Sequence, residues 1–332
     1  MYRKILVASI LIIMAAGALP VVAEAVEEAP WAHLVDNEFQ ANKKPGTVPT
    51  PDPAPQPAQS LPWGVDRIDA EKVWTETTGE GVKVAILDTG IDKDHPDLSV
   101  AGGVNYVQTG RKIDYSKWDD DNGHGTHVAG TIAALDNSIG VIGVAPGASI
   151  YAVKVLDRSG SGSLTWIING INWAVTNNMD IISMSLSTDY DYPQFKAAIQ
   201  AAYDAGIVII AAAGNDGSQV DYPAAYSTVV AVSATDSSDS LPYWSNYGSQ
   251  IEVSAPGVYI PSTWNDGYYN TISGTSMACP HVSGVAALVI QAHPSYTVDN
   301  VRTALHQAED RGTTGWDQYY GWGIVDAEAA IV

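Results

Sequence analysis

The chain has 332 residues, a formal net charge of −21 at pH 7 and a single cysteine, Cys279. The negative charge argues against nucleic acid and anionic membranes as partners, because both repel an acidic surface. One cysteine excludes an internal disulfide, so an exported fold must be stabilised by a large core or by bound ions.

Residues 1–25 have the pattern of a secretory signal peptide. Two basic residues precede an apolar run over residues 5–19, and "AEA" at 23–25 supplies small residues for a cleavage site. The apolar run is short for a transmembrane helix. We therefore expect a secreted, extracellular protein with no stable membrane association after signal cleavage. An uncleaved N-terminal anchor is the alternative.

Residues 26–57 are predicted to be a short pro-segment or linker. Prolines at 45, 49, 51, 53, 55 and 57 favour an extended, solvated chain. From residue 58 the pattern changes to apolar runs that alternate with helical stretches. The remaining length, residues 58–332, is enough for one large domain with its own core.

The apolar runs predict buried strands, because their apolar character is continuous rather than alternating. The predicted strands are 82–87, 149–156, 180–186, 206–213 and 228–234. Helices are expected over 164–178 and 194–206. This order predicts an α/β fold of three layers, in which a mostly parallel central sheet carries helices on both faces.

Polar residues follow two of these strands directly. Asp88 comes after the first strand, and Asn215 comes after the fourth. Ser276 lies where a glycine-bearing turn leads into an apolar helix. Active groups in open α/β sheets gather at the carboxyl ends of the strands, so these positions are candidate site residues.

Two histidines stand three residues apart in "DDDNGHGTHVAGTIAAL". His124 and His127 at this spacing share a helix face, so a metal-binding pair is one interpretation. A histidine general base beside a tightly packed helix is a second. The third is a buried helix start that carries imidazoles, and this segment alone does not decide between them.

A serine hydroxyl becomes a nucleophile only when a neighbouring base takes its proton, and that base needs a carboxylate to fix its tautomer. The tetrahedral intermediate of acyl transfer needs donors aimed at its oxyanion. The residues Asp88, His124, Asn215 and Ser276 supply all these groups, and a helix N-terminus at Ser276 favours developing negative charge.

Four segments carry a resemblance to a known family. "VAILDTGID", "NGHGTHVAGTIAAL", "AAAGNDG" and "GTSMACPHVSG" resemble the signature segments of the subtilisin-like serine proteases, in the same order. The resemblance covers residues 58–332 and implies the subtilisin-like fold, close to that of the bacterial secreted subtilisins. It assigns His124 as general base and acid, Asp88 as the group that orients it, and Ser276 as nucleophile. The side chain of Asn215 and the backbone N–H of Ser276 would form the oxyanion hole.

The same resemblance implies how substrate is held. The family binds an extended peptide between two chain segments, and main-chain hydrogen bonds of that kind are insensitive to sequence. The matching residues here are Ser159, Gly160, Ser161, Ser185, Leu186 and Ser187. This chain has Ser187-Thr188 where the family usually has two glycines, which adds bulk beside the first pocket.

Two aspartates near that pocket predict a substrate preference. Asp216 directly follows Asn215, and Asp221 directly precedes a Tyr-Pro pair that the family uses in its pocket wall. A carboxylate that faces the pocket would favour lysine or arginine before the cut bond. The alternative is that both carboxylates point to water and the pocket accepts apolar and aromatic residues.

Calcium is the cofactor that the resemblance implies. "LDNSIGV" matches the family's ion-binding loop, and carboxylate, amide and carbonyl oxygens suit a hard cation. The implied ligands are Gln59, Asp97, Leu135, Asn137, Ile139 and Val141. The run Asp119–Asp121 is either a second calcium site or a solvated face. The match at Gln59 also puts the mature N-terminus near Ala58. The preceding segment, residues 26–57, is then too short for a folded pro-domain.

We therefore expect a secreted, monomeric serine endopeptidase, made as a zymogen, that cuts protein and peptide substrates and is stabilised by calcium. One alternative is a catalytically silent, calcium-dependent binding protein on the same fold. Another is a selective processing protease. Beside the nucleophile, Met277 is expected to be exposed to oxidation, and Cys279 is expected to be small and buried behind the site.

Overall fold

The computed structural model describes residues 55–332, except residue 109 and residues 309–314. The predicted signal peptide and almost all of the predicted pro-segment lie outside the described residues. Within them, the chain forms a central sheet whose strands all run parallel, in the order β2-β3-β1-β4-β5-β6-β7. The strands are β1 Lys83–Asp88, β2 Val100–Asn105, β3 Ser149–Lys154, β4 Ile181–Met184, β5 Val208–Ala212, β6 Val230–Thr235 and β7 Ile251–Pro256.

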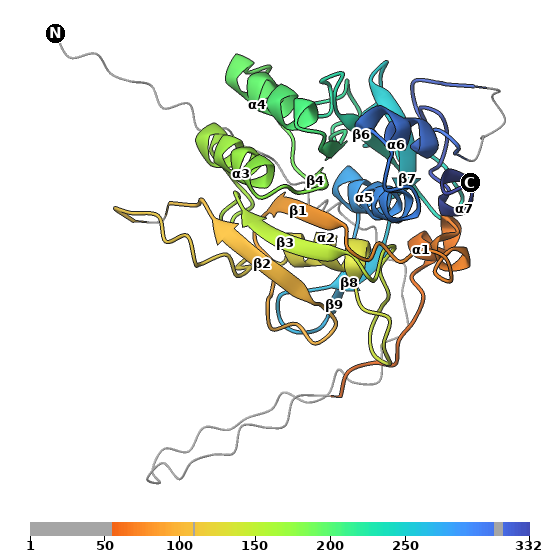
Figure 1. Cartoon of the computed structure of the whole chain (residues 1–332), viewed down its shortest axis with the longest axis horizontal. Coiled ribbons are helices and arrows are strands. Elements are labelled where there is room, and N and C mark those ends of the chain that lie inside the picture. Colours follow the sequence, from red (N-terminus) through yellow and green to blue (C-terminus); the bar gives the residue numbers. More distant parts are fainter. Residues whose placement is uncertain (1–54, 109, 309–314) are drawn as a thin grey trace, which may run out of the picture.

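Helices cover both faces of this sheet, which confirms the predicted three-layer α/β architecture (Figure 1). Helices α3 and α4 pack on one face, and α2 and α5 pack on the other. The helices are α1 Trp63–Arg67, α2 His124–Ala133, α3 Leu164–Thr176, α4 Pro193–Asp204, α5 Thr275–Ala292, α6 Val298–Leu305 and α7 Ala327–Ala330, with a 3₁₀ turn at Ala70–Lys72. A two-stranded antiparallel sheet, β8 Ile260–Thr263 with β9 Tyr269–Ile272, stands apart from the main sheet.

Two hydrophobic clusters form because successive strand residues point to opposite faces. In β1, Val84 and Ile86 belong to the cluster around α5, and Ala85 and Leu87 belong to the cluster under α3 and α4. Burial of each large aliphatic side chain contributes about 1.5–3 kcal/mol, so a sheet covered on both faces stabilises the fold without a disulfide.

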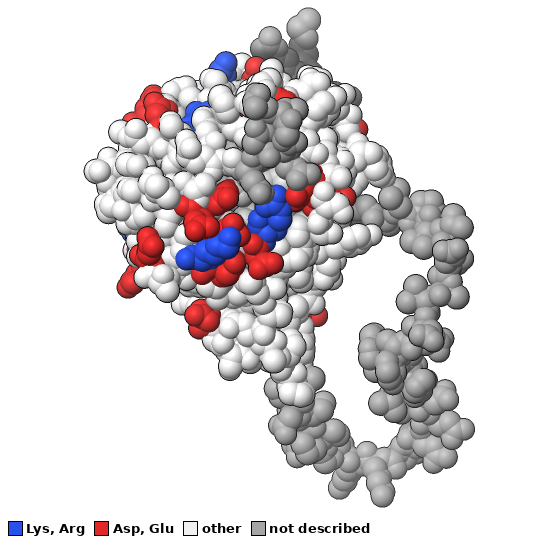
Figure 2. All heavy atoms as spheres, turned by 90° about the vertical axis from the view of Figure 1, so that its right-hand side faces the viewer, with Lys and Arg blue, Asp and Glu red and all other residues white. Residues whose placement is uncertain are grey.

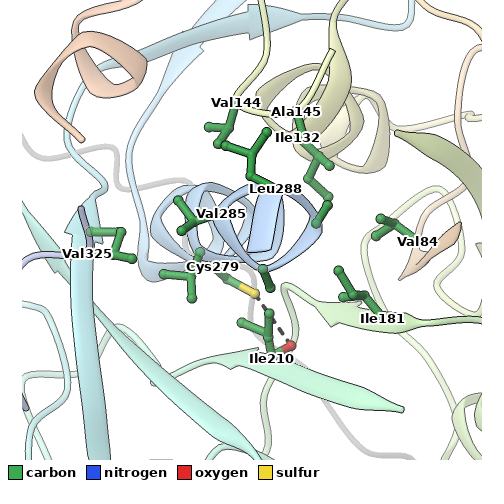
Figure 3. Packing of buried hydrophobic residues seen from close by; sticks show 14 of the residues in the cluster. Val84, Ile132, Val144, Ala145, Ile181, Ile210, Cys279, Val285, Leu288 and Val325 are labelled. Carbon is green, nitrogen blue, oxygen red and sulfur yellow. Dashed lines mark hydrogen bonds between the residues drawn. The ribbon is translucent and has the colours of Figure 1, made fainter. Parts of the chain in front are cut away.

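Helix α5 lies at the centre of the first cluster. Figure 3 shows its side chains between strand residues on one side and the α2 region on the other. Cys279 of α5 is fully buried and directs its sulfur toward the carbonyl oxygen of Ile210 in β5, at 3.6 Å. Burial raises the pKa of the Cys279 thiol to about 11, so the thiol stays protonated and acts as a small core residue.

Local signals explain where the flanking helices begin and end. The hydroxyl of Ser163 accepts the backbone N–H of Trp166 and so caps α3, and Pro193 occupies the first turn of α4. Gly206 follows α4 with φ of 87°, a left-handed conformation that only glycine adopts without strain.

The acidic charge of the chain is visible on the surface. Figure 2 shows acidic side chains around a few basic ones on the side of the molecule where α1 and α7 lie in Figure 1. Arg67 at the end of α1 pairs with Asp239 at 2.6 Å, and Lys72 in the 3₁₀ turn that follows pairs with Asp69 at 2.7 Å. Such exposed or half-exposed pairs contribute about 0–1 kcal/mol each, so they add little to the stability of the fold.

Among residues 55–332 with the two gaps, none of the helices has the length and apolar character needed to cross a bilayer.

Candidate active site

Asp88 ends strand β1 and is fully buried. Its Oδ1 accepts the backbone N–H of Thr89 at 2.7 Å. The Nδ1 atom of His124 lies 2.8 Å from Asp88 Oδ1 and 3.0 Å from Oδ2. Burial lowers the pKa of His124, but the charge and hydrogen bond of Asp88, with the charge of Asp120, outweigh burial and raise it. Asp88 therefore orients the imidazole, with Nδ1 toward the carboxylate and Nε2 on the opposite side of the ring.

The carboxylate of Asp120 joins the turn after β1 to the first turn of α2. Its Oδ1 accepts the hydroxyl of Thr89 at 2.9 Å and the backbone N–H groups of residues 122–123. Its Oδ2 accepts the N–H and hydroxyl of Thr126 at 3.0 and 2.6 Å. The Thr89 hydroxyl in turn accepts the N–H of Gly125. Asp120 thus ties together the two segments that carry Asp88 and His124.

The glycines around His124 allow close approach of neighbouring chain. Gly123 has φ of 112°, and a Cβ atom there would lie 2.3 Å from the ring of Trp264. A Cβ at Gly125 would lie 2.1 Å from the carbonyl oxygen of Gly90. These positions require glycine, so the small residues of this segment serve packing beside the Asp88–His124 pair.

The two histidines of this segment do not face a common ligand. His127 is fully buried, and its Nε2 lies 2.9 Å from the carbonyl oxygen of Ile260. Burial lowers the pKa of His127 to about 3, so this imidazole is neutral. The described part of the chain contains no group of three or more His, Cys, Asp or Glu side chains arranged to hold a metal. His124 contacts Asp88 and His127 contacts the Ile260 carbonyl, which favours a general base and a buried packing residue over a metal pair.

Ser276 lies in the first turn of α5, which begins at Thr275 after Gly274. Its hydroxyl donates to the carbonyl oxygen of Ser185 at 3.2 Å, and the hydroxyl of Ser185 donates to the carbonyl oxygen of Ser276 at 2.8 Å. The position at a helix N-terminus puts the backbone N–H groups of the first turn beside this hydroxyl. Negative charge that develops next to Ser276 is therefore stabilised.

Asn215 is held with one end of its side-chain amide fixed. Its Oδ1 accepts both the backbone N–H of Thr275, at 2.8 Å, and the Thr275 hydroxyl, at 3.0 Å. A Cβ atom placed on Gly274 would lie 3.8 Å from both Nδ2 and Oδ1 of Asn215 and 3.6 Å from the backbone nitrogen of Ser276. Because Thr275 holds Oδ1, Nδ2 is the donor end of the amide, and it lies in the same neighbourhood as the backbone N–H of Ser276.

The sheet order brings these residues to one edge. β1, β4 and β5 are neighbours, with Ile86 of β1 paired to Ser183 of β4. Asp88 ends β1, Ser185 follows β4, and Asn215 follows β5. All three therefore emerge at the carboxyl edge of adjacent parallel strands, where ligand sites of such sheets lie.

The first predicted substrate segment, Ser159–Ser161, is a tight turn after β3. Asp157 Oδ1 accepts the N–H and hydroxyl of Ser159 and the N–H of Ser161, and Gly160 has φ of 75°. Burial raises the pKa of Asp157, but these hydrogen bonds outweigh it and lower the pKa. The turn is thus held in shape by a carboxylate that stays ionised.

The second predicted segment, Ser185–Ser187, follows β4 and contacts one of the two predicted pocket aspartates. The hydroxyl of Ser187 donates to Asp221 Oδ2 at 2.9 Å, and a Cβ at Gly214 would lie 2.3 Å from the same oxygen. Asp221 is half-buried, whereas Asp216 is exposed. Burial raises the pKa of Asp221 to about 6, and the charges of Asp216 and Asp189 add to the increase.

The residues predicted to bind calcium lie in one hydrogen-bonded network. Gln59 Nε2 lies 2.7 Å from the carbonyl oxygen of Leu135 and 3.4 Å from that of Val141. Asp97 accepts the side-chain amide of Asn137 at 2.7 Å and the N–H of Val141 at 3.0 Å. The sixth residue joins through its backbone, because the N–H of Ile139 donates to Asn137 Oδ1 at 2.7 Å.

The role of Asp120 was not predicted from the sequence, and the predicted exposure of Met277 differs from the structure. Asp120 was interpreted only as part of an acidic run, although its neighbours Asp119 and Asp121 pair separately with Lys93 and Lys154. A carboxylate four residues before a histidine at a helix start was the available signal. The prediction of an exposed Met277 is wrong, because this side chain is 1% exposed and packs into the α5 core.

A parallel sheet with a paired aspartate and histidine, a serine at a helix N-terminus and a fixed asparagine amide at one edge defines the class of α/β serine endopeptidases. The chain belongs to the subtilase family, whose profile matches residues 79–323. It is 48% identical to Subtilisin NAT of Bacillus subtilis subsp. natto over 279 residues, which cover 82% of this chain and 72% of that protein. It is 47% identical to a subtilisin of Bacillus pumilus, covering 82% of this chain and 99% of the relative. It is also 46% identical to a thermostable alkaline protease of Halalkalibacterium halodurans over 310 residues, covering 92% and 84%.

Proposed function

We propose that this subtilisin-family serine endopeptidase uses Ser276 as nucleophile, His124 as general base and acid, and Asp88 to orient the histidine. Asn215 Nδ2 and the backbone N–H of Ser276 form the oxyanion hole. The observation that carries the proposal is the fixing of Asn215 Oδ1 by Thr275, which leaves Nδ2 as the donor end of the amide near the backbone N–H of Ser276. The buried Asp88–His124 pair supports the base.

The proposed reaction follows from these positions. His124 Nδ1 keeps its proton toward Asp88, so the Nε2 lone pair takes the proton of the Ser276 hydroxyl as the oxygen attacks the peptide carbonyl carbon. The resulting oxyanion accepts hydrogen bonds from Asn215 and Ser276 N–H. The peptide C–N bond breaks when His124 returns its proton to the leaving amine. Water, activated by the same histidine, then hydrolyses the acyl-enzyme.

Covalent labelling tests this assignment directly. A fluorophosphonate probe reacts with a serine only where a base activates the hydroxyl, and we expect one adduct, on the peptide that contains Ser276. The measurement is mass spectrometry of the digested, labelled protein, with His124→Ala as the variant that should lose labelling. An adduct on another serine, or none on active wild type, contradicts the proposal.

Protein chains bound as extended strands are the substrates we propose. The Ser185 carbonyl stands beside the nucleophile and is turned toward its hydroxyl. In that position it can accept the N–H of the residue that precedes the cut bond, as a neighbouring strand would. The segment 159–161 forms the opposite side of the same cleft in this proposal. Main-chain binding of this kind accepts many sequences, so selectivity falls to the first pocket.

We propose that the first pocket favours lysine or arginine. The Asp221 carboxylate lies between Gly214, next to the oxyanion asparagine, and Ser187, at the end of the second substrate segment. It is half-buried, and exposed carboxylates at 189 and 216 add negative potential. A desolvated carboxylate attracts a cationic side chain more strongly than an exposed one does.

Replacement of Asp221 by serine is expected to reduce kcat/KM for peptides that end in Arg or Lys by roughly ten- to hundredfold, since a hydrogen bond to a charged group contributes about 1.5–3 kcal/mol. Peptides ending in Phe or Leu should change little. Because the pKa of Asp221 is about 6, the wild-type preference for the basic peptides should grow as the pH rises through 6. Asp204→Ser on distant α4 is the control. Wild-type preference for Phe or Leu at pH 8 contradicts the prediction.

We propose that calcium binds where Gln59, Asp97 and the 135–141 loop meet. Asp97 is fully buried, and burial raises the pKa of its carboxyl despite hydrogen bonds from Val141 and Asn137. This carboxylate, the side-chain amides of Gln59 and Asn137 and the carbonyl groups of the 135–141 loop together offer the oxygen atoms that a hard cation takes as ligands. A half-turn of the Gln59 amide exchanges nitrogen for oxygen beside the Leu135 carbonyl without moving the backbone, so these residues fit the ion.

Removal of calcium is expected to lower Tm by roughly 5 °C, because an ion at a hundredfold excess over its Kd adds about 2.7 kcal/mol to the folded state. The measurement is calorimetry of the Ser276→Ala protein, which avoids self-digestion, with calcium and with chelator. Asp97→Asn in the same background should have a lower Tm that no longer responds to calcium. A Tm of the Ser276→Ala protein that is equal in both conditions rejects the site.

The proposed organisation follows the sequence pattern. We propose a signal peptide over 1–25, a pro-segment within 26–57, a catalytic domain over 58–332, and secretion of the mature enzyme as a monomer. The packed core of the described domain supports independent folding, because both faces of its sheet are covered by helices of the same chain.

A further inference from the structure

The chain is attached to the catalytic domain before residue 58. Gln56 Nε2 donates to the carbonyl oxygen of Gly267, in the turn between β8 and β9, at 3.0 Å. The carbonyl oxygen of Pro57 accepts the N–H of Gly140 at 2.8 Å. Ala58 then forms an antiparallel bridge with Ile139. Residues 56 and 57 are therefore part of the domain surface: Gln56 contacts the turn between β8 and β9, and Pro57 contacts the 135–141 loop.

The next two residues are bound in the same way. The N–H of Gln59 donates to the carbonyl oxygen of Ser138 at 3.1 Å, and the N–H of Ser60 donates to that of Gly140 at 2.8 Å. A protease must pull an extended segment out of such pairing before it can bind it as a strand. The bond Ala58–Gln59 is therefore protected in the folded protein.

Prolines alternate with other residues immediately before this attachment. Positions 49, 51, 53, 55 and 57 are all proline, in the stretch "PTPDPAPQP". Every peptide bond from Val48–Pro49 to Pro57–Ala58 consequently has a proline on one side. The pattern leaves a cutting enzyme two choices of register, with proline either before or after the cut bond.

Both registers conflict with the proposed site. In one, the residue before the cut bond is proline, which has no N–H to donate to the Ser185 carbonyl beside the nucleophile. The residue two positions earlier is also proline for each cut at Pro51 or later, so the next strand hydrogen bond is lost as well. In the other register, the cut bond is itself an X–Pro bond, whose ring crowds the preceding residue and whose nitrogen carries no hydrogen.

We propose that self-processing of this enzyme cannot occur within 48–58, cuts at Thr47–Val48 or earlier, and leaves the mature enzyme with a proline arm, residues 48–57, attached through Gln56 and Pro57. The step is ordinary hydrolysis: the acyl group of the earlier peptide bond is transferred to the Ser276 oxygen, the new N-terminal amine leaves with the proton from His124, and water then hydrolyses the ester. This inference rests on the proposed function. It moves the mature N-terminus away from Ala58, where the family resemblance put it.

The test uses the full chain with Ser276→Ala as substrate and purified active wild-type enzyme as protease. N-terminal sequencing and intact mass should give a trimmed chain that begins at Val48 or earlier. The Pro51→Ala/Pro53→Ala variant of the substrate restores N–H groups and cleavable bonds ahead of the attached residues 56 and 57, and its start should move to residues 52–54. Asp52→Ala/Ala54→Ser keeps every proline and should behave as the unchanged substrate.

The outcomes separate the arm from the catalytic assignment. A chain that begins anywhere from Pro49 to Gln59 in the unchanged substrate overturns the arm, even when the wild-type enzyme digests other proteins normally. An unmoved start in the Pro51→Ala/Pro53→Ala substrate overturns it too. The catalytic assignment fails by a different result, namely peptidase activity of the Ser276→Ala chain on its own.

Discussion

Replacement of Ser276 by alanine is expected to lower kcat by about a millionfold, as loss of the nucleophile does in subtilisin. The variant should stay folded, because the Ser276 hydroxyl donates one hydrogen bond, to the Ser185 carbonyl. In the variant, water can donate to that carbonyl instead, so no buried polar group loses its partner. The measurement is kcat on a chromogenic peptide, with near-UV circular dichroism as the test of folding.

A second serine of α5 provides the matched control. Ser283 is fully buried, and its hydroxyl oxygen lies 2.9 Å from Ser183 Oγ and 3.1 Å from the carbonyl oxygen of Cys279. Ser283→Ala should cost about 1 kcal/mol of stability and leave kcat unchanged. Activity of Ser276→Ala above a thousandth of wild type, in material from a host without proteases, would remove Ser276 from the role of nucleophile.

Replacement of Asn215 by leucine is expected to lower kcat by roughly a hundred- to a thousandfold, or about 2.7–4 kcal/mol, because the oxyanion loses one of its two donors. KM should change little, since the amide contacts the oxygen most strongly after it becomes an anion. Steady-state kinetics on one good peptide substrate measures both constants. An equal increase in KM with unchanged kcat would show that Asn215 binds ground-state substrate instead.

The hydrogen bonds to Asn215 allow a graded test of the same idea. Thr275 holds Asn215 Oδ1 with its N–H and its hydroxyl, so Thr275→Val removes one of the two restraints and keeps the amide. A loss of about two- to tenfold in kcat is expected, corresponding to one ordinary hydrogen bond. A loss as large as that of Asn215→Leu would mean that the substitution at 275 distorts the first turn of α5.

The five predicted strands are confirmed, and the two strands of the central sheet that were missed, β2 and β7, explain the limits of the pattern. β2 contains Gly102 and Gly103 and a shift of register against β3, so it lacks the apolar run of a buried strand. β7 alternates polar and apolar residues although all its residues are buried. Glu252 is tolerated there because Arg302 and His306 pair with its carboxylate, and that pairing depends on a helix 50 residues away in sequence.

The candidate site divides in the same manner. Asp88, His124, Asn215 and Ser276 could be predicted because each lies in a long motif or directly after a strand. Asp120 was missed although it precedes His124 by four residues, since its role depends on donors from Thr89 and from its own turn that only the fold brings together. Asp221 was predicted from its place before the Tyr-Pro pair, but its contact with Ser187 was not, because the packing of two loops sets that distance.

The order of the sheet has a consequence for how the enzyme assembles. β1 is the first strand along the chain but lies in the middle of the sheet, where Val84 pairs with Ile181, 97 residues later (181 − 84). Parallel pairings between such distant segments form slowly, because the entropy of closing a long loop is lost before the contacts are gained. Asp88 can meet the chain that follows β4 and β5 only after this closure. A chain that is still being synthesised, or is only partly folded, therefore has no working site. Proteolytic activity appears only after β1 and β4 have paired, when the enzyme's own fold protects it from self-digestion.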